Sequence, residues 1–170
     1  MTTSRIPVVR QTSWLMVIPQ LIVMLSLIVL VEIIFRPEPF ILSGAYGAGL
    51  YLLYSYGSRW LLLKLHRQGM QLTRQEKYQE AANKFDASYQ FFTDHAWIDK
   101  YRSLTMMIPA AISYREMALI NSGYCYVQLG DSAKAKMYYQ KALAEFPESA
   151  MAHAALKLLE TAENQPEIKK

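Results

Sequence analysis

The sequence has a single cysteine, Cys125, and only three histidines among its 170 residues. One cysteine cannot form a disulfide within the chain, and a structural zinc site needs about four cysteine or histidine ligands close together. The three histidines, His66, His95 and His153, are far apart, and none has the spacing of a metal-binding pair. We therefore expect no disulfide framework, no metal site and no cofactor.

The sequence also lacks the motifs of common catalytic sites. It has no glycine-rich phosphate-binding loop and no Gly-x-Ser-x-Gly nucleophile elbow. Cys125 lies in an apolar helical pattern, where a free cysteine behaves as a small buried residue. The basic residues, which give a net charge of +4, flank apolar segments and are not interleaved with aromatic residues. The sequence therefore predicts neither an enzyme nor a nucleic-acid-binding protein.

Hydrophobic residues make up 52% of the chain, and many of them fall in two long runs near its beginning. Residues 14–35 are almost all apolar, and a helix of this length spans roughly 33 Å, enough to cross a hydrocarbon core of about 30 Å. Pro19 suggests a kink or an unwound entry. A secretory signal peptide is the alternative, but the run is longer than the core of a signal and no small-residue cleavage site follows. We expect a transmembrane helix.

A second apolar run, residues 40–63, follows the interruption Arg36-Pro37-Glu38-Pro39. Two prolines cannot continue a helix, so the interruption is expected to be a turn at a membrane surface. The second run is also long enough to span a bilayer, and its small residues recur four apart, which lets membrane helices pack closely. We predict a transmembrane hairpin in which the second helix packs on the first through Gly44, Ala45, Ala48 and Gly49.

The basic residues predict the orientation of this hairpin. Only Arg36 lies in the turn, and the others flank the opposite ends of the two runs: Arg5, Arg10, Arg59, Lys64 and Arg67. By the positive-inside rule both termini are cytoplasmic, in a bacterial-type inner membrane. Glu32 precedes Arg36 by four residues, so an ion pair between them is expected. A proton relay would need a second carboxylate or a histidine in the two runs, and neither run has one.

Residues 116–149 place small and aromatic residues at fixed positions. Gly123 and Ala135 would let two antiparallel helices approach closely, with tyrosines filling the space beside them. Gly130-Asp131 supplies a break between the helices and Pro147 stops the second. The pattern resembles a tetratricopeptide (TPR) unit, a helix–turn–helix repeat of about 34 residues; the alternative is an ordinary helical hairpin. Ser122 replaces the usual Leu, and the matching positions are Leu119, Gly123, Tyr126, Ala135, Tyr139, Ala142 and Pro147.

A degenerate copy of the same pattern occupies residues 62–95, with Gly69, Ala81 and Phe85 at the corresponding positions. Its first helix would continue the second apolar run. The glycines of the two copies are farther apart than the roughly 34 residues of a direct tandem, so residues 96–115 form an insertion. Residues 150–161 are expected to form a capping helix, and residues 162–170 a polar tail.

The insertion is rich in apolar and aromatic residues at near-helical spacing, with Pro109 as its expected end. Two interpretations stay open. It packs as a short helix over the repeat core, or it touches the membrane interface or a partner, because Trp, Tyr and basic residues suit such a surface. The apolar positions are Trp97, Ile98, Tyr101, Leu104, Met107 and Ile108.

The resemblance to TPR proteins implies protein binding on a concave face formed by the first helix of each repeat. Of the positions that grip a carboxylate in clamp-type TPR domains only Asn121 matches, so we expect an apolar peptide or helix as ligand. The positions on this face are mostly apolar: Leu63, His66, Met70, Thr73, Met117, Ile120, Tyr124 and Val127.

The sequence therefore predicts an all-α protein, with a tail (1–13), a transmembrane hairpin (14–63, helices 14–35 and 40–63) and a small TPR-like α-solenoid (62–161). The expected function is that of a membrane-anchored scaffold or assembly factor that recruits client proteins. The alternative is a permanent structural subunit of a larger membrane complex. Two repeats and a cap fall short of the three or so that a stable stack needs, so support from the membrane helices, the insertion, self-association or a partner is also expected.

Overall fold

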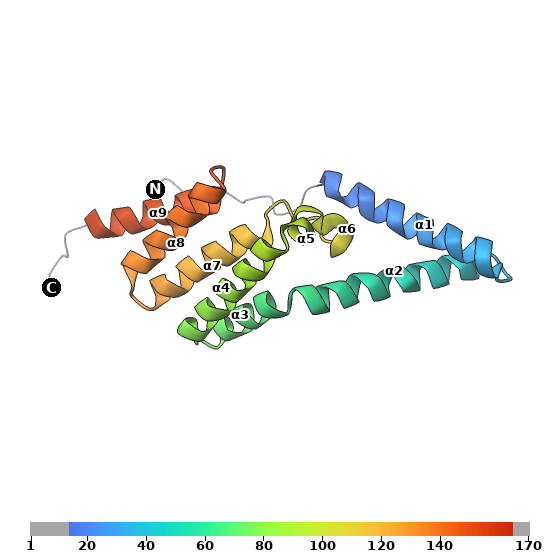
Figure 1. The fold of residues 1–170 in the computed structure, drawn as a ribbon, viewed down its shortest axis with the longest axis horizontal. Helices are drawn as coiled ribbons and strands as arrows, with labels where there is room; N and C mark the ends of the chain where they lie inside the picture. The colour runs from blue at the N-terminus through green and yellow to red at the C-terminus, as the bar shows by residue number, and fades with distance from the viewer. Residues whose placement is uncertain (1–13, 165–170) are drawn as a thin grey trace, which may run out of the picture.

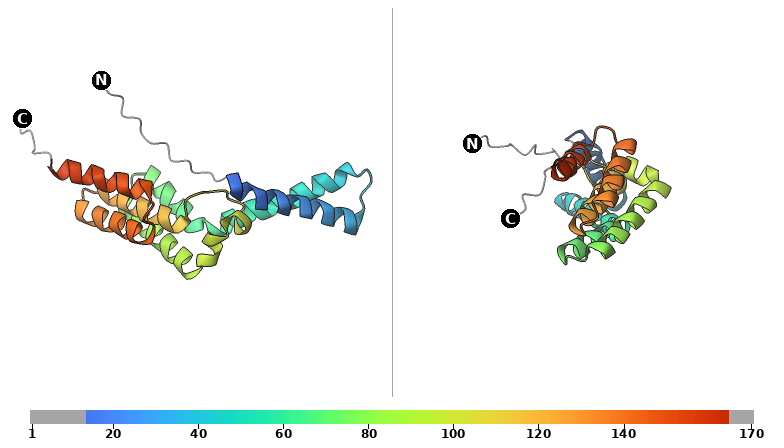
Figure 2. Two further views of the ribbon diagram at one scale, coloured as in Figure 1. Left: turned by 90° about the horizontal axis from the view of Figure 1, so that it is seen from above. Right: turned by 90° about the vertical axis from the view of Figure 1, so that its left-hand side faces the viewer.

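The computed structural model describes residues 14–164, and every regular element in that range is helical. Two long helices extend from one end of a cluster of shorter ones, as Figures 1 and 2 show. The predicted tail 1–13, with Arg5 and Arg10, lies outside the described range, as does the predicted tail 162–170 from residue 165 onward; its first three residues continue the predicted capping helix to Asn164. The α-helices are α1 (Ile18–Phe35), α2 (Ile41–Leu62), α3 (Lys64–Arg74), α4 (Tyr78–Asp94), α5 (Ala96–Lys100), α6 (Arg102–Thr105), α7 (Tyr114–Gln128), α8 (Ser132–Glu145) and α9 (Ala150–Asn164).

The first long helix has the length and composition of a membrane span. An 18-residue window within Trp14–Phe35 has a mean hydropathy of 2.6, and only 6% of this window is buried. It opens with a 3₁₀ turn, Trp14–Val17, and Pro19 lies in the first turn of α1, where its missing N–H costs no hydrogen bond. This is the single helix of the described range that passes a hydropathy criterion for crossing a membrane, a criterion that a signal sequence also meets.

Helices α1 and α2 pack against each other along residues four apart on α2. Gly47 lies at the closest approach, because a Cβ atom there would sit 2.6 Å from the Cα atom of Ile28. Ser43 and Ser55, on the same face of α2, are buried. The seam therefore follows small-residue spacing, as membrane helices do when their backbones come close.

This seam differs from the predicted face of Gly44, Ala45, Ala48 and Gly49. Among the described residues, no atom lies within 4 Å of a Cβ placed at Gly44 or Gly49, and Ala45 is exposed. Small residues do recur four apart in α2, but several series with this spacing overlap in the same stretch. The one that faces α1 is Ser43, Gly47 and Ser55.

Glu32 also has a different partner from the predicted one. The hydroxyl of Ser43 donates a hydrogen bond to the Glu32 carboxylate across the helix pair. Within residues 14–164 no ion pair joins Glu32 to Arg36. Arg36 instead ends α1 in the left-handed conformation (φ 40°), and its backbone N–H donates to the Glu32 carbonyl oxygen at 3.1 Å. This backbone change carries the Arg36 side chain off the regular helical path that an i,i+4 pair requires.

Helix α2 runs into α3 with a one-residue interruption at Leu63. Helical hydrogen bonds continue on both sides, from Leu63 N–H to the Arg59 carbonyl at 3.1 Å and from Arg67 N–H to the Leu63 carbonyl at 2.9 Å. The second long helix and the first helix of the repeat domain therefore form a nearly continuous rod, visible along the lower edge of Figure 1.

Two helical hairpins, α3–α4 and α7–α8, share one packing device. A Cβ atom at Gly69 would lie 2.7 Å from the ring of Phe85, and one at Gly123 would lie 2.6 Å from the ring of Tyr139. In each hairpin an aromatic ring of the second helix thus rests directly on a glycine of the first. The same steric rule positions both pairs, although only the second has a nearly complete sequence pattern.

The insertion folds as two short helices, α5 and α6, followed by an extended segment. Its buried Arg102 explains the compact path, because the guanidinium donates to the carbonyls of Asp99 at 3.0 Å, Ala110 at 2.7 Å and Ala111 at 2.9 Å. The predicted apolar stripe is divided: Ile98 and Met107 are buried and Ile108 is partly so, whereas three members are exposed, namely Trp97, Tyr101 and Leu104.

Candidate protein-interaction surface

Side chains of helices α3 and α7, which both pack on α4, approach each other at two places. The Asn121 side-chain amide lies 3.8 Å from the Met70 sulfur, and the Thr73 hydroxyl lies 3.9 Å from the sulfur of Cys125. We give the name α3–α7 face to the predicted binding residues that are accessible: Met70, Thr73, Met117, Ile120, Tyr124 and Val127. Met70, Tyr124 and Val127 are exposed, and the others are partly buried.

One end of this face is hollowed. Met117 lines an apolar depression of about 270 Å³ together with Tyr114 and Met151. The far wall comes from the extended part of the insertion, through Ile108 and Ile112. The insertion therefore contributes to the surface that sequence reasoning assigned to the repeat helices alone.

Two predicted members of the face, Leu63 and His66, are buried. Leu63 packs in a core cluster with Phe92, Ile98 and Met106, so the insertion covers it. The His66 ring makes edge contacts with the rings of Phe85, at a centroid distance of 5.3 Å, and Tyr114, at 5.2 Å. Neither residue is available to a ligand, because the insertion lies over the part of α3 that a direct tandem would leave open.

His66 is uncharged in this setting. Burial lowers its pKa from 6.5 to about 4, since no opposite charge offsets the lost hydration. Its Nδ1 atom is buried and has no hydrogen-bond partner within the described part of the chain. The side chain therefore acts as a neutral aromatic core residue at neutral pH.

A partly buried polar link joins the two repeats. Asp86 of α4 accepts a hydrogen bond from the Ser122 hydroxyl at 3.1 Å and one from the Tyr138 hydroxyl at 2.7 Å. Ser122 is the position at which the repeat departs from the usual Leu, and the contact with Asp86 explains the departure. Burial and the nearby Asp86 charge raise the pKa of Tyr138, so its hydroxyl stays a donor.

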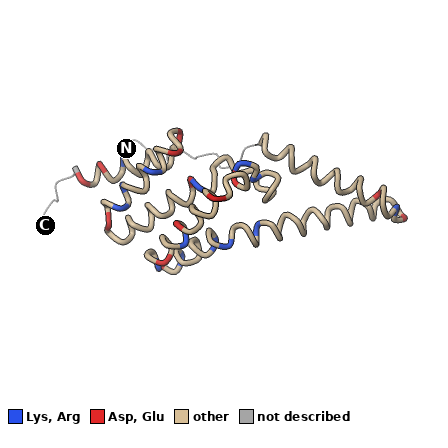
Figure 3. The backbone as a smooth tube through the Cα atoms, viewed as in Figure 1, with Lys and Arg blue, Asp and Glu red and all other residues tan. Residues whose placement is uncertain are grey.

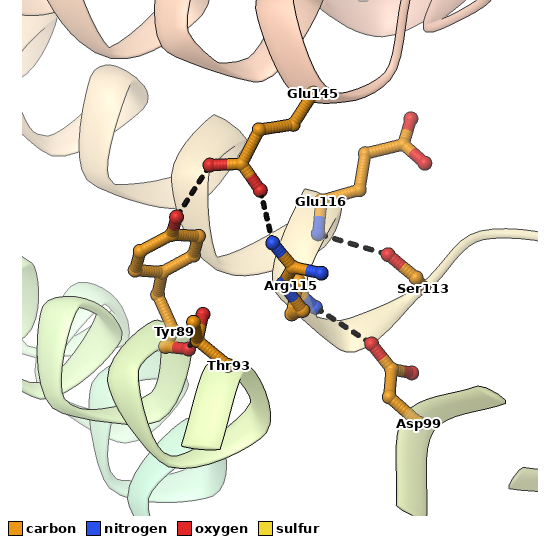
Figure 4. Close-up of polar contacts among 7 residues, drawn as sticks. All are labelled: Tyr89, Thr93, Asp99, Ser113, Arg115, Glu116 and Glu145. Atoms are coloured by element: carbon orange, nitrogen blue, oxygen red, sulfur yellow. Dashed lines mark hydrogen bonds and ion pairs between the residues drawn. The ribbon is translucent and has the colours of Figure 1, made fainter. Parts of the chain in front are cut away.

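A second polar cluster, drawn in Figure 4, fixes the start of α7. The carboxylate of Asp99, from α5, accepts hydrogen bonds from the backbone N–H groups of Tyr114 at 2.9 Å and Arg115 at 3.1 Å. Ser113 accepts one from the Glu116 N–H at 3.1 Å and caps the helix. An acidic side chain from the insertion thus satisfies N–H groups that a helix start leaves open.

The same cluster ties α7 to α4 and α8. The carboxylate of Glu145 accepts hydrogen bonds from the Arg115 guanidinium and the Tyr89 hydroxyl, as Figure 4 shows. The guanidinium also lies 5.8 Å from the centre of the Tyr89 ring. Sequence reasoning missed Asp86, Asp99, Arg115 and Glu145, because their partners are distant in the chain and no local spacing connects them.

The titratable residues of the described range are dispersed over the fold. Between residues 14 and 164, no group of three or more His, Cys, Asp or Glu side chains is placed to hold a metal ion. Cys125 is buried, and burial raises the pKa of its thiol, which therefore stays protonated at neutral pH.

The paired helical hairpins and the exposed α3–α7 face define a helical-repeat protein. Residues 117–149, which comprise most of α7, all of α8 and the following turn, match the family model of the tetratricopeptide repeat. This segment is therefore identified as a tetratricopeptide repeat, a helical unit that in general serves protein–protein interaction. No curated protein and no solved structure matches the chain.

Proposed function

We propose that this protein is a membrane-anchored scaffold or assembly factor that recruits client proteins to the cytoplasmic surface of a bacterial-type inner membrane. Helices α1 and α2 form the transmembrane hairpin, and the repeat domain lies on the side of the termini. The observation that carries the proposal is the near-continuous rod of α2 and α3, because it would hold the α3–α7 face at a fixed orientation to the membrane.

The environment of α2 supports its role as a second span, although its hydropathy is lower than that of α1. Several of the polar residues that lower it have protein partners or are buried: Ser43 and Ser55 are buried, and the Arg59 guanidinium bonds to the carbonyls of Met106 and Met107. The tyrosines of α2 are mostly exposed. A membrane interior tolerates polar groups when protein partners satisfy them. Figure 3 shows both long helices nearly free of charge between the turn and the last part of α2.

The basic residues support the orientation. Arg59, Lys64 and Arg67 follow one another at the junction of α2 and α3, at the repeat-domain end of the hairpin. Basic residues flanking membrane spans favour the cytoplasmic side, and the turn between the helices carries Arg36 alone. The repeat domain would then lie where cytoplasmic client proteins are present.

The composition of the α3–α7 face supports an apolar ligand. Tyr124, at its centre, is 43% exposed, and its ring meets that of Tyr78 at a centroid distance of 6.4 Å. Met70 and Val127 add exposed apolar area on either helix. Aromatic and methionine side chains are enriched in the cores of protein interfaces, so an amphipathic helix or an extended apolar segment of a client fits this face.

The test is affinity purification of the full chain from its native membrane in mild detergent, with Tyr124→Glu as the perturbing variant. A charge at the centre of an apolar face should reduce client recovery at least about tenfold, because a buried unpaired carboxylate weakens an interface by more than about 1.4 kcal/mol. The matched control is Met137→Glu, since Met137 is an exposed apolar residue on α8 outside the face. Equal recovery with both variants would refute the assignment of the face.

A second candidate function, a permanent subunit of a larger membrane complex, is favoured by one observation. An exposed apolar groove of about 510 Å³ lies along the hairpin and is lined by residues of both α1 and α2. The small residues Ala45 and Gly49 leave space in it for a neighbouring membrane helix, or for a second copy of the chain. The groove is lined by Val31, Phe35, Ala45, Tyr46, Gly49, Leu50 and Leu53.

Partner behaviour separates the two candidates. A subunit should be recovered with stoichiometric partners that survive a salt wash, and Gly49→Leu should release them while Tyr124→Glu leaves them bound. A scaffold should show substoichiometric partners that the wash removes, and the effects of the two variants should be reversed. Recovery of the chain with only itself would indicate self-association.

A further inference from the structure

One apolar surface is used neither by the repeat core nor by the α3–α7 face. On the outside of α5 and α6, Trp97, Tyr101 and Leu104 are exposed, while the opposite side of the same two helices is buried through Ile98 and Met106. We call these three exposed residues the α5–α6 face. The Lys100 ammonium lies 5.5 Å from the centre of the Tyr101 ring, so a cation borders the face.

The α5–α6 face lies at the open end of the helical hairpin. Figures 1 and 2 show α5 and α6 beside the ends of α1 and α2 that are remote from the turn. Helix α6 packs on α1, and α5 and α6 also meet α2. An apolar depression of about 470 Å³ separates Trp97 and Thr105 from Leu53, Gly57 and Leu61 of α2. The insertion is thus in contact with both proposed membrane spans.

The backbone at the end of α6 has its carbonyl groups capped by α2. The Tyr54 hydroxyl donates to the Leu104 carbonyl at 3.0 Å and lies 3.3 Å from that of Thr105. The Arg59 guanidinium donates to the Met106 carbonyl at 2.9 Å and also to that of Met107. The end of a helix leaves such carbonyls without partners.

This capping suits a segment that lies against lipid. In water, solvent can satisfy the free carbonyls at a helix end, and side-chain donors can do so as well. Non-helical backbone at membrane depth is tolerated only where protein groups satisfy it. Tyr54 donates to the Leu104 carbonyl and Arg59 donates to those of Met106 and Met107, which leaves the outer surface of the segment apolar.

The three tryptophans of the chain lie in the segments that form the open end of the helical hairpin. Trp14 begins the first long helical segment, Trp60 lies in the last turn of α2, and Trp97 lies in α5. All three are between 60% and 71% exposed. Trp and Tyr concentrate at membrane–water interfaces, where their rings are apolar but keep a polar edge, and Lys and Arg there meet anionic headgroups.

We infer that the α5–α6 face lies in the boundary between lipid headgroups and acyl chains of the leaflet on the repeat-domain side. This inference rests on the proposed transmembrane hairpin. The insertion is then a third membrane contact beside α1 and α2. Together the three contacts prevent the repeat domain from rotating about the α2–α3 rod, and they fix the direction in which the α3–α7 face points.

The test uses tryptophan fluorescence of the full chain in phospholipid vesicles that contain brominated lipids. Trp14→Phe with Trp60→Phe leaves Trp97 as the single tryptophan, and Trp14→Phe with Trp97→Phe leaves Trp60. Adding Leu158→Trp to a chain whose three tryptophans are replaced by phenylalanine gives a water-exposed control, because Leu158 is 72% exposed on α9, remote from the hairpin. Circular dichroism confirms that each variant is folded.

Bromine near the headgroups should quench Trp97 to about the same extent as Trp60 and at least about twofold more than the tryptophan at position 158, as an interfacial ring requires. Quenching of Trp60 with Trp97 no more affected than the control would overturn the inference while leaving the hairpin intact. If neither Trp60 nor Trp97 is quenched, membrane insertion itself fails. A Trp97 shielded from both lipid bromine and aqueous acrylamide would also overturn it, since the face would then be covered by protein.

Discussion

His66 gives the repeat domain a pH-dependent stability whose size follows from its burial. Its pKa is 6.5 when exposed and about 4 in the folded protein, so the unfolded chain binds a proton more readily than the folded one. Stability is therefore complete above pH 6.5 and is lost as the pH falls from 6.5 toward 4. At about 1.4 kcal/mol per pKa unit, the full loss is about 3 kcal/mol, and between pH 7 and pH 5 it is about 2 kcal/mol.

The assay is urea unfolding of the full chain in a mild detergent at pH 7 and pH 5, followed by circular dichroism. His66→Phe keeps an aromatic ring between Phe85 and Tyr114 but cannot titrate. The decrease in its free energy of unfolding from pH 7 to pH 5 should therefore be smaller than that of the native chain by about 2 kcal/mol. His153→Gln, a change at an exposed histidine, should retain the native dependence. An unchanged pH dependence in His66→Phe would refute the reasoning.

Three further predictions concern packing. Gly123→Ala should lower the free energy of unfolding by about 1–2 kcal/mol in the same urea assay, because the added methyl group meets an aromatic ring at 2.6 Å and the clash exceeds the gain in helix propensity. Gly47→Leu should separate the two long helices and abolish a cross-link engineered between them, whereas Gly49→Leu, at a position open to its surroundings, should preserve it. Ser122→Ala should cost about 1 kcal/mol of unfolding free energy by removing one of the two donors to Asp86; no measurable loss would contradict its role.

The repeat packing was predictable from the sequence because its determinants are steric and local. Gly69 with Phe85 and Gly123 with Tyr139 lie at the same separation in their hairpins, and each pair meets as the pattern requires. The degenerate repeat, residues 62–95, could be recognised for the same reason. A glycine opposite an aromatic residue is detectable in the sequence even where other positions of the repeat differ from the usual pattern.

The features that the sequence did not predict depend on long-range contacts. Leu63 and His66 occupy positions that a repeat normally exposes, and only the path of the insertion shows that they are covered. Asp99 and Arg102 are charged residues in a segment of near-helical spacing, and only the fold shows that they are buried and organise the insertion and the start of α7. The identity of the α1–α2 seam depended on which of several overlapping small-residue series faces Ile28, and this is a rotational choice that spacing alone does not fix.

The central claim, recruitment of a client through the α3–α7 face, is tested most directly by site-specific photocross-linking in the native membrane. A photoreactive amino acid would replace Tyr124 in one chain and Met137 in another, both being exposed positions. The account predicts a discrete cross-linked partner from position 124 that is absent from position 137. The same partner from both positions, or from position 137 alone, would contradict it.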